Sequence, residues 1–349
     1  MISVIIPIYN TAKWLSLCID SVLKQDFRDI EVILVNDAST DKSLSVCKRY
    51  AAIDDRIILI DKQRNEGVEL ARQSGYTIAR GEYVMYIDAD DWLDHTQVLS
   101  NMYEKAESTG ADYVEIGAQW VLDNRKWFKH SPRASRVFGL IETPELFDKY
   151  YISYFGVSIL SVNMWGKLYR KTVLDYVDIE PFGLVYGEDF MYNMSLFPHL
   201  QKIYVLNEIG YNYRYGGMSC HYNPRVFEDL KRMYCMKEES IKQYKYYKAS
   251  DAVRIEMKNI FKSEICQKIE FGKENRETII TYIDKEIKRP LYNKMLKVDK
   301  TSGFWNDPFV LAFADGNSIA MYEICYRQVR KEHPKRVLKR FAAQIIQSL

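Results

Sequence analysis

Runs of consecutive apolar residues alternate with amphipathic segments through the N-terminal part of this chain. Four largely apolar runs have the length of a buried strand: residues 2–8, 31–35, 56–60 and 83–87, of which 31–35 and 56–60 begin with a charged residue. The segments between them space their apolar side chains as helices do: residues 11–24, 39–52 and 68–79. Thr11 is the expected N-cap of the first helix, and Ser39 or Thr40 that of the second. This alternation predicts an α/β fold with a mostly parallel, doubly wound sheet flanked by helices.

The pattern changes after the fourth strand. Helices are expected at residues 96–108, 143–153 and 190–197, and strands at residues 113–121, 203–206 and 211–215. Residues 122–138 are polar, basic and aromatic, which favours a hairpin or a mobile loop. From about residue 224 the chain is charged and helix-like. We therefore predict a domain at 1–222, followed by a helical C-terminal region at 223–349.

Three aspartates follow the fourth predicted strand: Asp88, Asp90 and Asp91. The carboxyl ends of parallel strands form the crevice in which open α/β sheets bind ligands. Clustered carboxylates repel one another unless a cation or protons join them, and hard oxygen donors favour Mg²⁺ or Mn²⁺. The cluster therefore predicts a metal and phosphate site. The alternative is a helix N-terminus with an acidic first turn, a role that suits Asp91.

The other predicted strand ends bring further candidates to the same edge of the sheet. Tyr9 can stack on a base, and Asp37 can accept a hydrogen bond from a ring N–H such as that of uracil. Asn65 begins a turn in which Gly67 lets a ligand approach the backbone, and Arg72 lies in the next helix. Each residue also has an ordinary interpretation: core packing for Tyr9, turn formation for Asp37 and Asn65, and a surface charge for Arg72.

Two common nucleotide-binding motifs are missing from the first strand-to-helix turn. It contains neither GxGxxG nor GxxxxGK[ST], which a dinucleotide dehydrogenase or a P-loop enzyme needs there. A sugar nucleotidyltransferase would have a glycine-rich and basic loop in place of Asn10-Thr11-Ala12. These absences favour a diphosphate held with the help of a metal.

Composition narrows the class of protein further. The 349 residues are 47% hydrophobic and carry a net charge of +2, which does not indicate nucleic-acid binding. Six scattered cysteines without a CxxC pair suggest reduced thiols. The chain has no signal-peptide pattern and no run of about 18 apolar residues. We therefore expect a cytoplasmic protein.

Six motifs resemble those of family 2 glycosyltransferases. They are Ser3-Val4-Ile5-Ile6-Pro7-Ile8-Tyr9-Asn10, Val35-Asn36-Asp37-Ala38-Ser39-Thr40-Asp41, Asn65-Glu66-Gly67 with Arg72, Ile87-Asp88-Ala89-Asp90-Asp91, Trp165-Gly166-Lys167-Leu168-Tyr169 and Gly187-Glu188-Asp189. The resemblance implies a GT-A fold, with nucleotide-sugar binding in residues 1–110 and the acceptor side in 111–222. It also implies transfer of a sugar from a nucleotide diphosphate with inversion, in the manner of bacterial capsule or lipopolysaccharide enzymes.

The resemblance also assigns roles to residues on the donor side. It places Pro7, Tyr9 and Asp37 around the base, and Asp88 near the ribose. Asn10 and Asn65 lie in the same motifs and are further candidates for nucleotide binding. Arg72 matches a basic position near the nucleotide. UDP is the expected carrier, because a carboxylate at Asp37 suits the N3–H of uracil.

Metal and catalytic roles follow from the same resemblance. Asp90 belongs to a DXD-type motif and is the expected ligand of Mn²⁺ or Mg²⁺. His221, on a glycine-containing loop, is a candidate further ligand or an exposed side chain. Asp189 is the expected general base, with Glu188 contacting the acceptor or orienting the site; an acidic first helical turn is the alternative for this pair. Lys167 either touches the diphosphate or acceptor or is a solvated lysine.

The resemblance implies two partners: a nucleotide-sugar donor and a glycan or lipid-linked acceptor. The C-terminal residues 327–349 carry seven basic side chains against one acidic side chain. Such a segment suits peripheral contact with an anionic inner membrane, or a solvated helix packed on the domain or on a second subunit as in a homodimer. The competing function is a nucleotide-binding or scaffold protein of the same fold without turnover.

Overall fold

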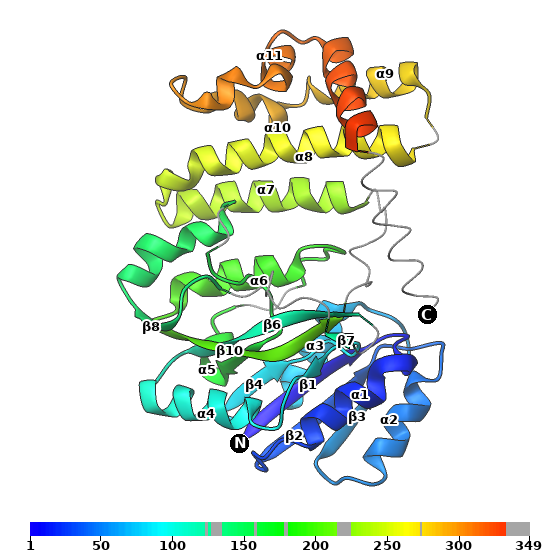
Figure 1. Ribbon diagram of the computed structural model, residues 1–349, viewed down its shortest axis with the longest axis vertical. Coiled ribbons are helices and arrows are strands. Elements are labelled where there is room, and N and C mark those ends of the chain that lie inside the picture. Colours follow the sequence, from blue (N-terminus) through cyan, green and yellow to red (C-terminus); the bar gives the residue numbers. More distant parts are fainter. Residues whose placement is uncertain are drawn as a thin grey trace. The chain divides into compact units, whose positions relative to one another are not determined.

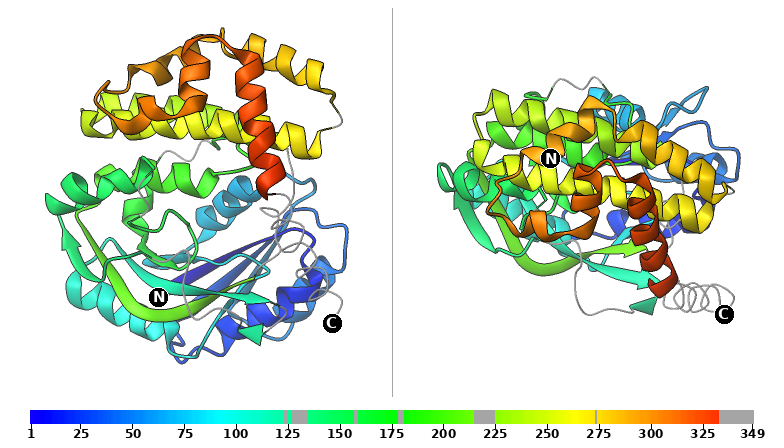
Figure 2. Two further views of the ribbon diagram at one scale, coloured as in Figure 1. Left: turned by 45° about the horizontal axis from the view of Figure 1, so that its top comes forward. Right: turned by 90° about the horizontal axis from the view of Figure 1, so that it is seen from above.

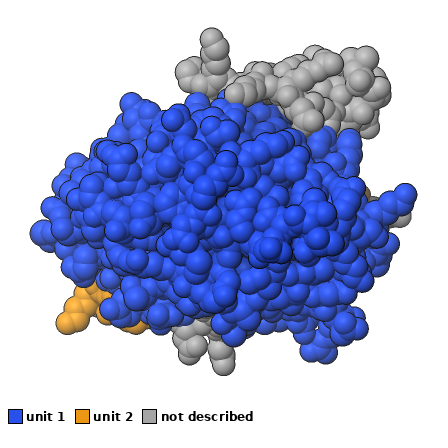
Figure 3. All heavy atoms as spheres, turned by 90° about the horizontal axis from the view of Figure 1, so that it is seen from below, with its two compact units in different colours: residues 1–154, 158–184, 188–217 blue, residues 155–157, 185–187, 218–349 orange. Residues whose placement is uncertain are grey.

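The structure is a computed structural model that describes residues 1–122, 125–126, 135–156, 159–177, 181–214, 225–272 and 274–332 (Figure 1). The chain divides into two units, coloured separately in Figure 3. Unit 1 comprises residues 1–154, 158–184 and 188–217, and unit 2 comprises residues 155–157, 185–187 and 218–349.

A ten-stranded sheet forms the centre of unit 1 among the described residues. Its strands are β1 (Ile2–Ile8), β2 (Ile30–Asn36), β3 (Ile57–Asp61), β4 (Tyr83–Tyr86), β5 (Trp92–Leu93), β6 (Tyr113–Leu122), β7 (Arg125–Lys126), β8 (Gly139–Glu142), β9 (Lys167–Arg170) and β10 (Lys202–Arg214). They lie in the order β3-β2-β1-β4-β9-β6-β10-β5, with β7 beside β6 and β8 beside β10. Neighbours β3, β2, β1 and β4 are parallel, whereas β9 is antiparallel to both β4 and β6.

Helices cover both faces of this sheet. They are α1 (Ala12–Leu23), α2 (Ser43–Ala51), α3 (Val68–Ile78), α4 (Val98–Thr109), α5 (Lys171–Leu174) and α6 (Glu188–Leu196). Alternate residues of β1 point to opposite faces, so Val4 and Ile6 join the core beneath α1, α2 and α4. Ile5 faces α3, where a Cβ on Gly75 would lie 2.5 Å from the Ile5 side chain. The predicted parallel α/β arrangement is confirmed.

Four predicted elements differ clearly from the observed ones, namely the helices at 39–52 and 143–153 and the strands at 203–206 and 211–215. The second helix begins at Ser43, because Asn10 Oδ1 accepts the N–H of Thr40 and Asp41 Oδ1 accepts the N–H of Ser43. Residues 143–153 form a π turn (Leu146–Tyr150) and a 3₁₀ turn (Tyr151–Tyr154) rather than a regular helix.

The two strands predicted at 203–206 and 211–215 are one strand, β10, with register shifts against β6 between Val205 and Tyr211. Gly210 lies between the two predicted strands. In the structure it allows close packing, because a Cβ there would lie 2.2 Å from the side chain of Ile116.

Unit 2 is helical in its described part (Figure 2). Its helices are α7 (Arg225–Gln243), α8 (Ser250–Phe271), α9 (Arg276–Glu286), α10 (Pro290–Asn293) and α11 (Pro308–Ala314), with 3₁₀ turns at Tyr247–Ala249, Lys294–Lys297 and Gly303–Asn306 and a final helix over 318–332. The predicted helical C-terminal region is thus confirmed over these residues. Among the described helices, none has the length and apolar character needed to cross a bilayer.

Candidate active site

The carboxyl ends of β1, β2 and β4 lie at one edge of the sheet, because these neighbouring strands are parallel. Tyr9 follows β1 and is 47% exposed, so its ring is available to a ligand. Pro7 is buried within β1 opposite Val35.

Asp37 follows β2 and is only 2% exposed. Its carboxylate accepts the backbone N–H groups of Glu66, at 3.0 Å, and of Gly67, at 2.8 Å. Asn65 Nδ2 donates to the carbonyl of Asp37 at 3.3 Å. Gly67 has φ +92° and open space where a Cβ would lie, as expected for a close ligand approach. The hydrogen bonds of Asp37 therefore hold the turn after β3 against the end of β2.

Asn10 has a positive φ of 53° and joins the loop before α2 to the end of β1. Its Oδ1 accepts the N–H groups of Thr40, at 2.8 Å, and of Asp41, at 3.2 Å. The acceptor side of the Asn10 amide is thus occupied by the protein.

Arg72 of α3 connects carboxylates that are distant in the sequence. Its guanidinium donates to Asp88 Oδ1 at 3.0 Å and to Asp189 Oδ1 at 2.5 Å, and lies 4.0 Å from Glu188 Oε1. The Arg72 side chain is 8% exposed. Burial alone would lower the pKa of Arg72, but Asp189, Asp88 and Glu188 raise it, so the cation is retained. The end of β4 and the start of α6 therefore meet around one arginine.

The carboxylates around Arg72 have different protonation preferences. Burial, with the neighbouring charge of Asp189, raises the pKa of Glu188 to about 8. Burial also raises the pKa of Asp88 to about 6, against the opposing effect of Arg72. Asp189 Oδ2 accepts the backbone N–H of Met164 at 3.1 Å. At neutral pH, Glu188 is therefore mainly protonated and Asp88 mainly ionised.

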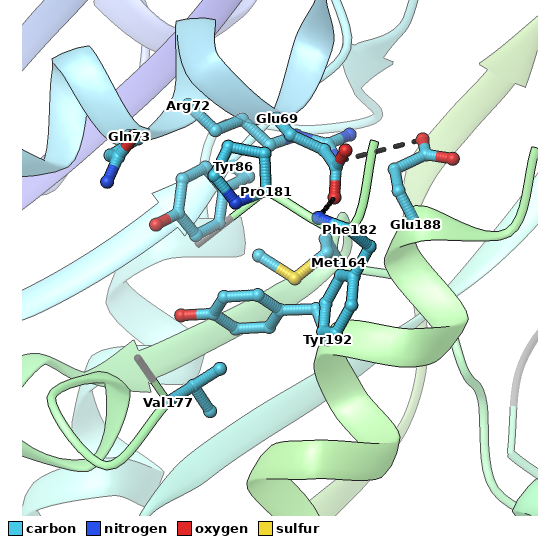
Figure 4. Close-up of a pocket in the computed structure, with 10 residues that line it drawn as sticks. All are labelled: Glu69, Arg72, Gln73, Tyr86, Met164, Val177, Pro181, Phe182, Glu188 and Tyr192. Carbon is cyan, nitrogen blue, oxygen red and sulfur yellow. Dashed lines mark hydrogen bonds and ion pairs between the residues drawn. The ribbon is translucent and has the colours of Figure 1, made fainter. Parts of the chain in front are cut away.

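Glu188 lines a pocket beside Arg72, together with Tyr86, Phe182 and Tyr192 (Figure 4). The empty volume of this pocket is about 450 Å³, counted with its opening to solvent. The Glu188 side chain is 20% exposed, and such partial burial disfavours the charged form of a carboxyl group.

Asp90 and Asp91 contact different groups of Arg214: its guanidinium and its backbone N–H, respectively. Asp90 pairs with Arg214 at the end of β10, and the Arg214 guanidinium carbon lies 5.1 Å from the Trp14 ring centroid. Asp91 is 2% exposed and accepts from the Tyr211 hydroxyl at 2.9 Å and the Arg214 N–H at 2.8 Å. The residues after Asp91 form β5 (Trp92–Leu93) rather than a helix. The helix N-terminus alternative for Asp91 is therefore wrong.

The donor atoms at this edge suit a hard divalent cation, because Asp88 and Asp90 offer carboxylate oxygens. Within the described residues, no group of three metal-ligating side chains is already assembled. A cation bound through Oδ2 of Asp90 would compete with Arg214, which pairs with that oxygen. The predicted ligand His221 lies outside the described residues.

Lys167 does not fit the expectation of ligand contact or of a solvated side chain. It is 0% exposed, and its ammonium donates to the carbonyls of Ser161 and Asn163, each at 2.8 Å, and to Asn193 Oδ1 at 3.2 Å. All three N–H donors of the ammonium therefore have partners inside the protein.

Comparison with known proteins identifies the family. A family model described as "Glycosyl transferase family 2" matches residues 3–176. The uncharacterized glycosyltransferase EpsJ of Bacillus subtilis (strain 168) is 30% identical over 272 residues, which cover 76% of this chain and 75% of EpsJ. The chain belongs to glycosyltransferase family 2. The predicted family and enzyme class are thus confirmed.

Two further similarities extend the family assignment. Glycosyltransferase GlyA of Streptococcus pneumoniae serotype 4 is 31% identical over 215 residues, which cover 61% of this chain but only 30% of GlyA. The crystal structure of S. aureus TarS 1-349 in complex with UDP-GlcNAc matches with a TM-score of 0.66 at 19% identity, covering 96% of this chain and 91% of that chain. At that identity the match shows the fold alone. This family 2 chain therefore has the fold expected from its motifs.

Two residues near this edge of the sheet were not expected from the sequence. Arg214 pairs with Asp90, and Asn193 donates to the carbonyl of Asp189 at 2.9 Å. The position of Asn193 one helical turn after Asp189 was the available signal. For Arg214 the only signal was a basic side chain at the end of a predicted strand.

Proposed function

We propose that this family 2 glycosyltransferase transfers a sugar from a UDP-sugar to a glycan or lipid-linked acceptor in bacterial surface polysaccharide synthesis. The observation that carries this proposal is the junction at Arg72, which joins Asp88 to Glu188 and Asp189. UDP-GlcNAc in the TarS complex supports a UDP-linked donor, and the bacterial sources of GlyA, EpsJ and TarS support a bacterial setting.

The donor nucleotide occupies residues 1–110 in this proposal, and residues 111–222 serve the acceptor. Tyr9 stacks on the uracil, and Pro7 and Asn10 shape the edge beside it. Asp37 binds the uracil N3–H with lone pairs left over from the Glu66 and Gly67 N–H groups. Asn65 supports Asp37 from the turn after β3.

Asp189 is the proposed general base. The acceptor hydroxyl attacks the anomeric carbon from the face opposite the diphosphate and gives its proton to an Asp189 oxygen. A positioned base of this kind typically contributes about 10²–10⁴-fold. Protonated Glu188 can donate a hydrogen bond to the acceptor without adding negative charge. Arg72 holds Asp189 near Asp88, which binds the ribose of the donor.

Asp90 is the proposed ligand of Mn²⁺ or Mg²⁺, with His221 as a candidate second ligand. The bound cation would neutralise charge on the departing diphosphate. Arg214, released from Asp90, remains next to Trp14 as a second positive group at this edge.

The proposed setting is the cytoplasmic face of the inner membrane, with peripheral contact through the basic residues 327–349. Most of this segment lies outside the described residues. A homodimer is the alternative use of the same segment.

Enzyme assays test the proposal directly. Purified protein is incubated with a panel of UDP-sugars and Mn²⁺, and UDP release is measured. We expect release with the matching donor, and a fall of about 10²-fold or more in both Asp90→Ala and Asp189→Ala. Asp55→Ala, at the opposite end of the sheet before β3, is the matched control and keeps full activity. Equal slow release by the wild type and both active-site variants would favour the non-catalytic scaffold.

A further inference from the structure

A buried network lies behind the proposed base, on the side away from solvent. Lys167 of β9 and Asn193 of α6 are 0% and 2% exposed, and neither side chain is available to a substrate. Lys167 Nζ donates to Asn193 Oδ1 at 3.2 Å, which links the two residues directly.

Both residues hold the backbone of the short segment 161–163. Lys167 Nζ donates to the carbonyls of Ser161 and Asn163, each at 2.8 Å. Asn193 Nδ2 donates to the carbonyl of Val162 at 3.3 Å. Three consecutive carbonyls are therefore fixed by two buried side chains.

The next residue of this segment contacts the proposed base. Met164 N–H donates to Asp189 Oδ2 at 3.1 Å, and Asn193 Nδ2 also donates to the Asp189 carbonyl at 2.9 Å. Arg72 already holds the other carboxylate oxygen, Oδ1, at 2.5 Å. The Asp189 carboxylate is thus oriented from one side by Arg72 and from the other by the segment that Lys167 and Asn193 fix.

We propose that Lys167 and Asn193 are positioning residues that orient Asp189 through residues 161–164. This inference rests on the proposed role of Asp189 as the base. A buried ammonium is costly, and its retention requires hydrogen bonds to every donor. Lys167 meets that requirement with three acceptors and a Tyr113 ring 5.2 Å away. Glu115, which faces Lys167 across β6 and β9, supplies a nearby negative charge.

The test compares Asn193→Ala and Lys167→Met with Tyr169→Phe. The Tyr169 hydroxyl donates to the same Asn193 Oδ1 at 2.9 Å. Among the described contacts, this hydroxyl makes no hydrogen bond to residues 161–164 or to Asp189. Tyr169→Phe therefore removes a buried hydrogen bond of the same network without releasing the segment, and serves as the matched control for lost stability.

We expect Asn193→Ala and Lys167→Met to lower kcat about 10–100-fold, because a small misplacement of a catalytic group has effects of this size. The KM for the donor and the affinity for UDP stay within about twofold of wild type, since the donor contacts lie elsewhere. We expect Tyr169→Phe to keep kcat near that of the wild type, although its melting temperature falls by an amount comparable to that in Asn193→Ala and Lys167→Met. Asn193→Asp, which keeps the acceptor but loses both N–H donors, serves if Asn193→Ala does not fold.

Two outcomes overturn the proposal and are distinguishable from each other. If Asp189→Ala abolishes transfer while the Asn193 and Lys167 variants keep kcat, or lose it only in proportion to stability as Tyr169→Phe does, the positioning role is wrong and the proposed function stands. If wild type and Asp189→Ala release UDP equally, both the proposed function and the positioning role are wrong.

Discussion

Acidic side chains outnumber basic ones at this edge of the sheet. Among the described residues, Asp88, Asp90, Asp91, Glu188 and Asp189 gather there, and the arginines Arg72 and Arg214 form ion pairs with four of them. Burial raises the pKa of Glu188 to about 8 and also raises the pKa of Asp91, and both shifts lower the excess of negative charge. A neutral Glu188 also leaves Arg72 free to pair with Asp189, so the two adjacent carboxyl groups have different roles.

This protonation has a measurable effect on stability. The folded-state pKa of Glu188, about 8, lies above its ordinary value of 4.5, so the folded protein binds more protons between these values. The free energy of unfolding must therefore fall as pH rises from about 4.5 to 8. Glu188→Gln cannot ionise and escapes this loss. We expect it to be more stable than wild type by about 1–3 kcal/mol at pH 8, with a smaller difference at pH 5.

Urea unfolding of both proteins at a series of pH values measures this difference. A difference that is constant from pH 5 to pH 8 would show that Glu188 does not titrate in this range. The same variant keeps the hydrogen-bonding ability of a protonated Glu188. Its kcat should therefore remain much closer to wild type than that of Asp189→Ala.

At the scale of elements, the sequence predicted best those features that local residue patterns determine, such as the positions of strands and of their ends. The strand ends carrying Tyr9, Asp37 and Asp88 were expected at one edge because apolar runs and parallel connections alone place them there. The partners of these residues were not expected. Asp90 meets Arg214 across 124 residues, and Arg72 meets Asp189 across 117 residues. No local pattern encodes such contacts.

Errors at this scale have tertiary causes. Lys167 lies beside Trp165 in a strand, and a single lysine in a strand is ordinarily solvated. Its burial depends on acceptors from residues 161, 163 and 193, which only the folded chain brings together. The two strands predicted at 203–206 and 211–215 form one strand, and the tight packing of Ile116 against Gly210 within it is a tertiary constraint.

The helices of unit 2 offer a matched test of buried charge. Lys231 and Lys237 both lie on α7 and are each 3% exposed in their side chains. Lys231 bridges Glu264 of α8, at 3.0 Å, and Glu286 of α9, at 3.5 Å, and both glutamates are 7% exposed. Lys237 pairs at 2.6 Å with Glu256, which is 27% exposed.

We expect Lys231→Met to destabilise the protein by about 3–5 kcal/mol, because it leaves the buried carboxylate of Glu264 without its cation, whereas Glu286 keeps its ion pair with Arg289 at 2.9 Å. Lys237→Met should cost clearly less, about 1–2 kcal/mol, because Glu256 can be hydrated where it stands. Urea denaturation of the two variants gives the comparison. If both variants lose the same free energy of unfolding, the burial of the partner carboxylates does not determine the destabilisation.

At the scale of the whole molecule, ligand binding links the proposed chemistry to stability. A ligand that binds only the folded state raises the free energy of unfolding by about 2.7 kcal/mol at one hundred times its Kd. UDP with Mn²⁺ should therefore raise the melting temperature of the wild type more than UDP alone does. The additional rise in melting temperature would come from binding of the metal, for which Asp90 is the proposed ligand.

Asp90→Asn separates these two contributions. It keeps the shape of the side chain and loses the charge that holds the cation, so the rise with UDP alone should remain while the additional rise with Mn²⁺ disappears. Asp55→Asn, with the same change of charge before β3, should keep both. If Asp90→Asn retains the full Mn²⁺-dependent rise, the cation binds elsewhere. The pairing of Asp90 with Arg214 would then be its permanent state rather than one that the metal replaces.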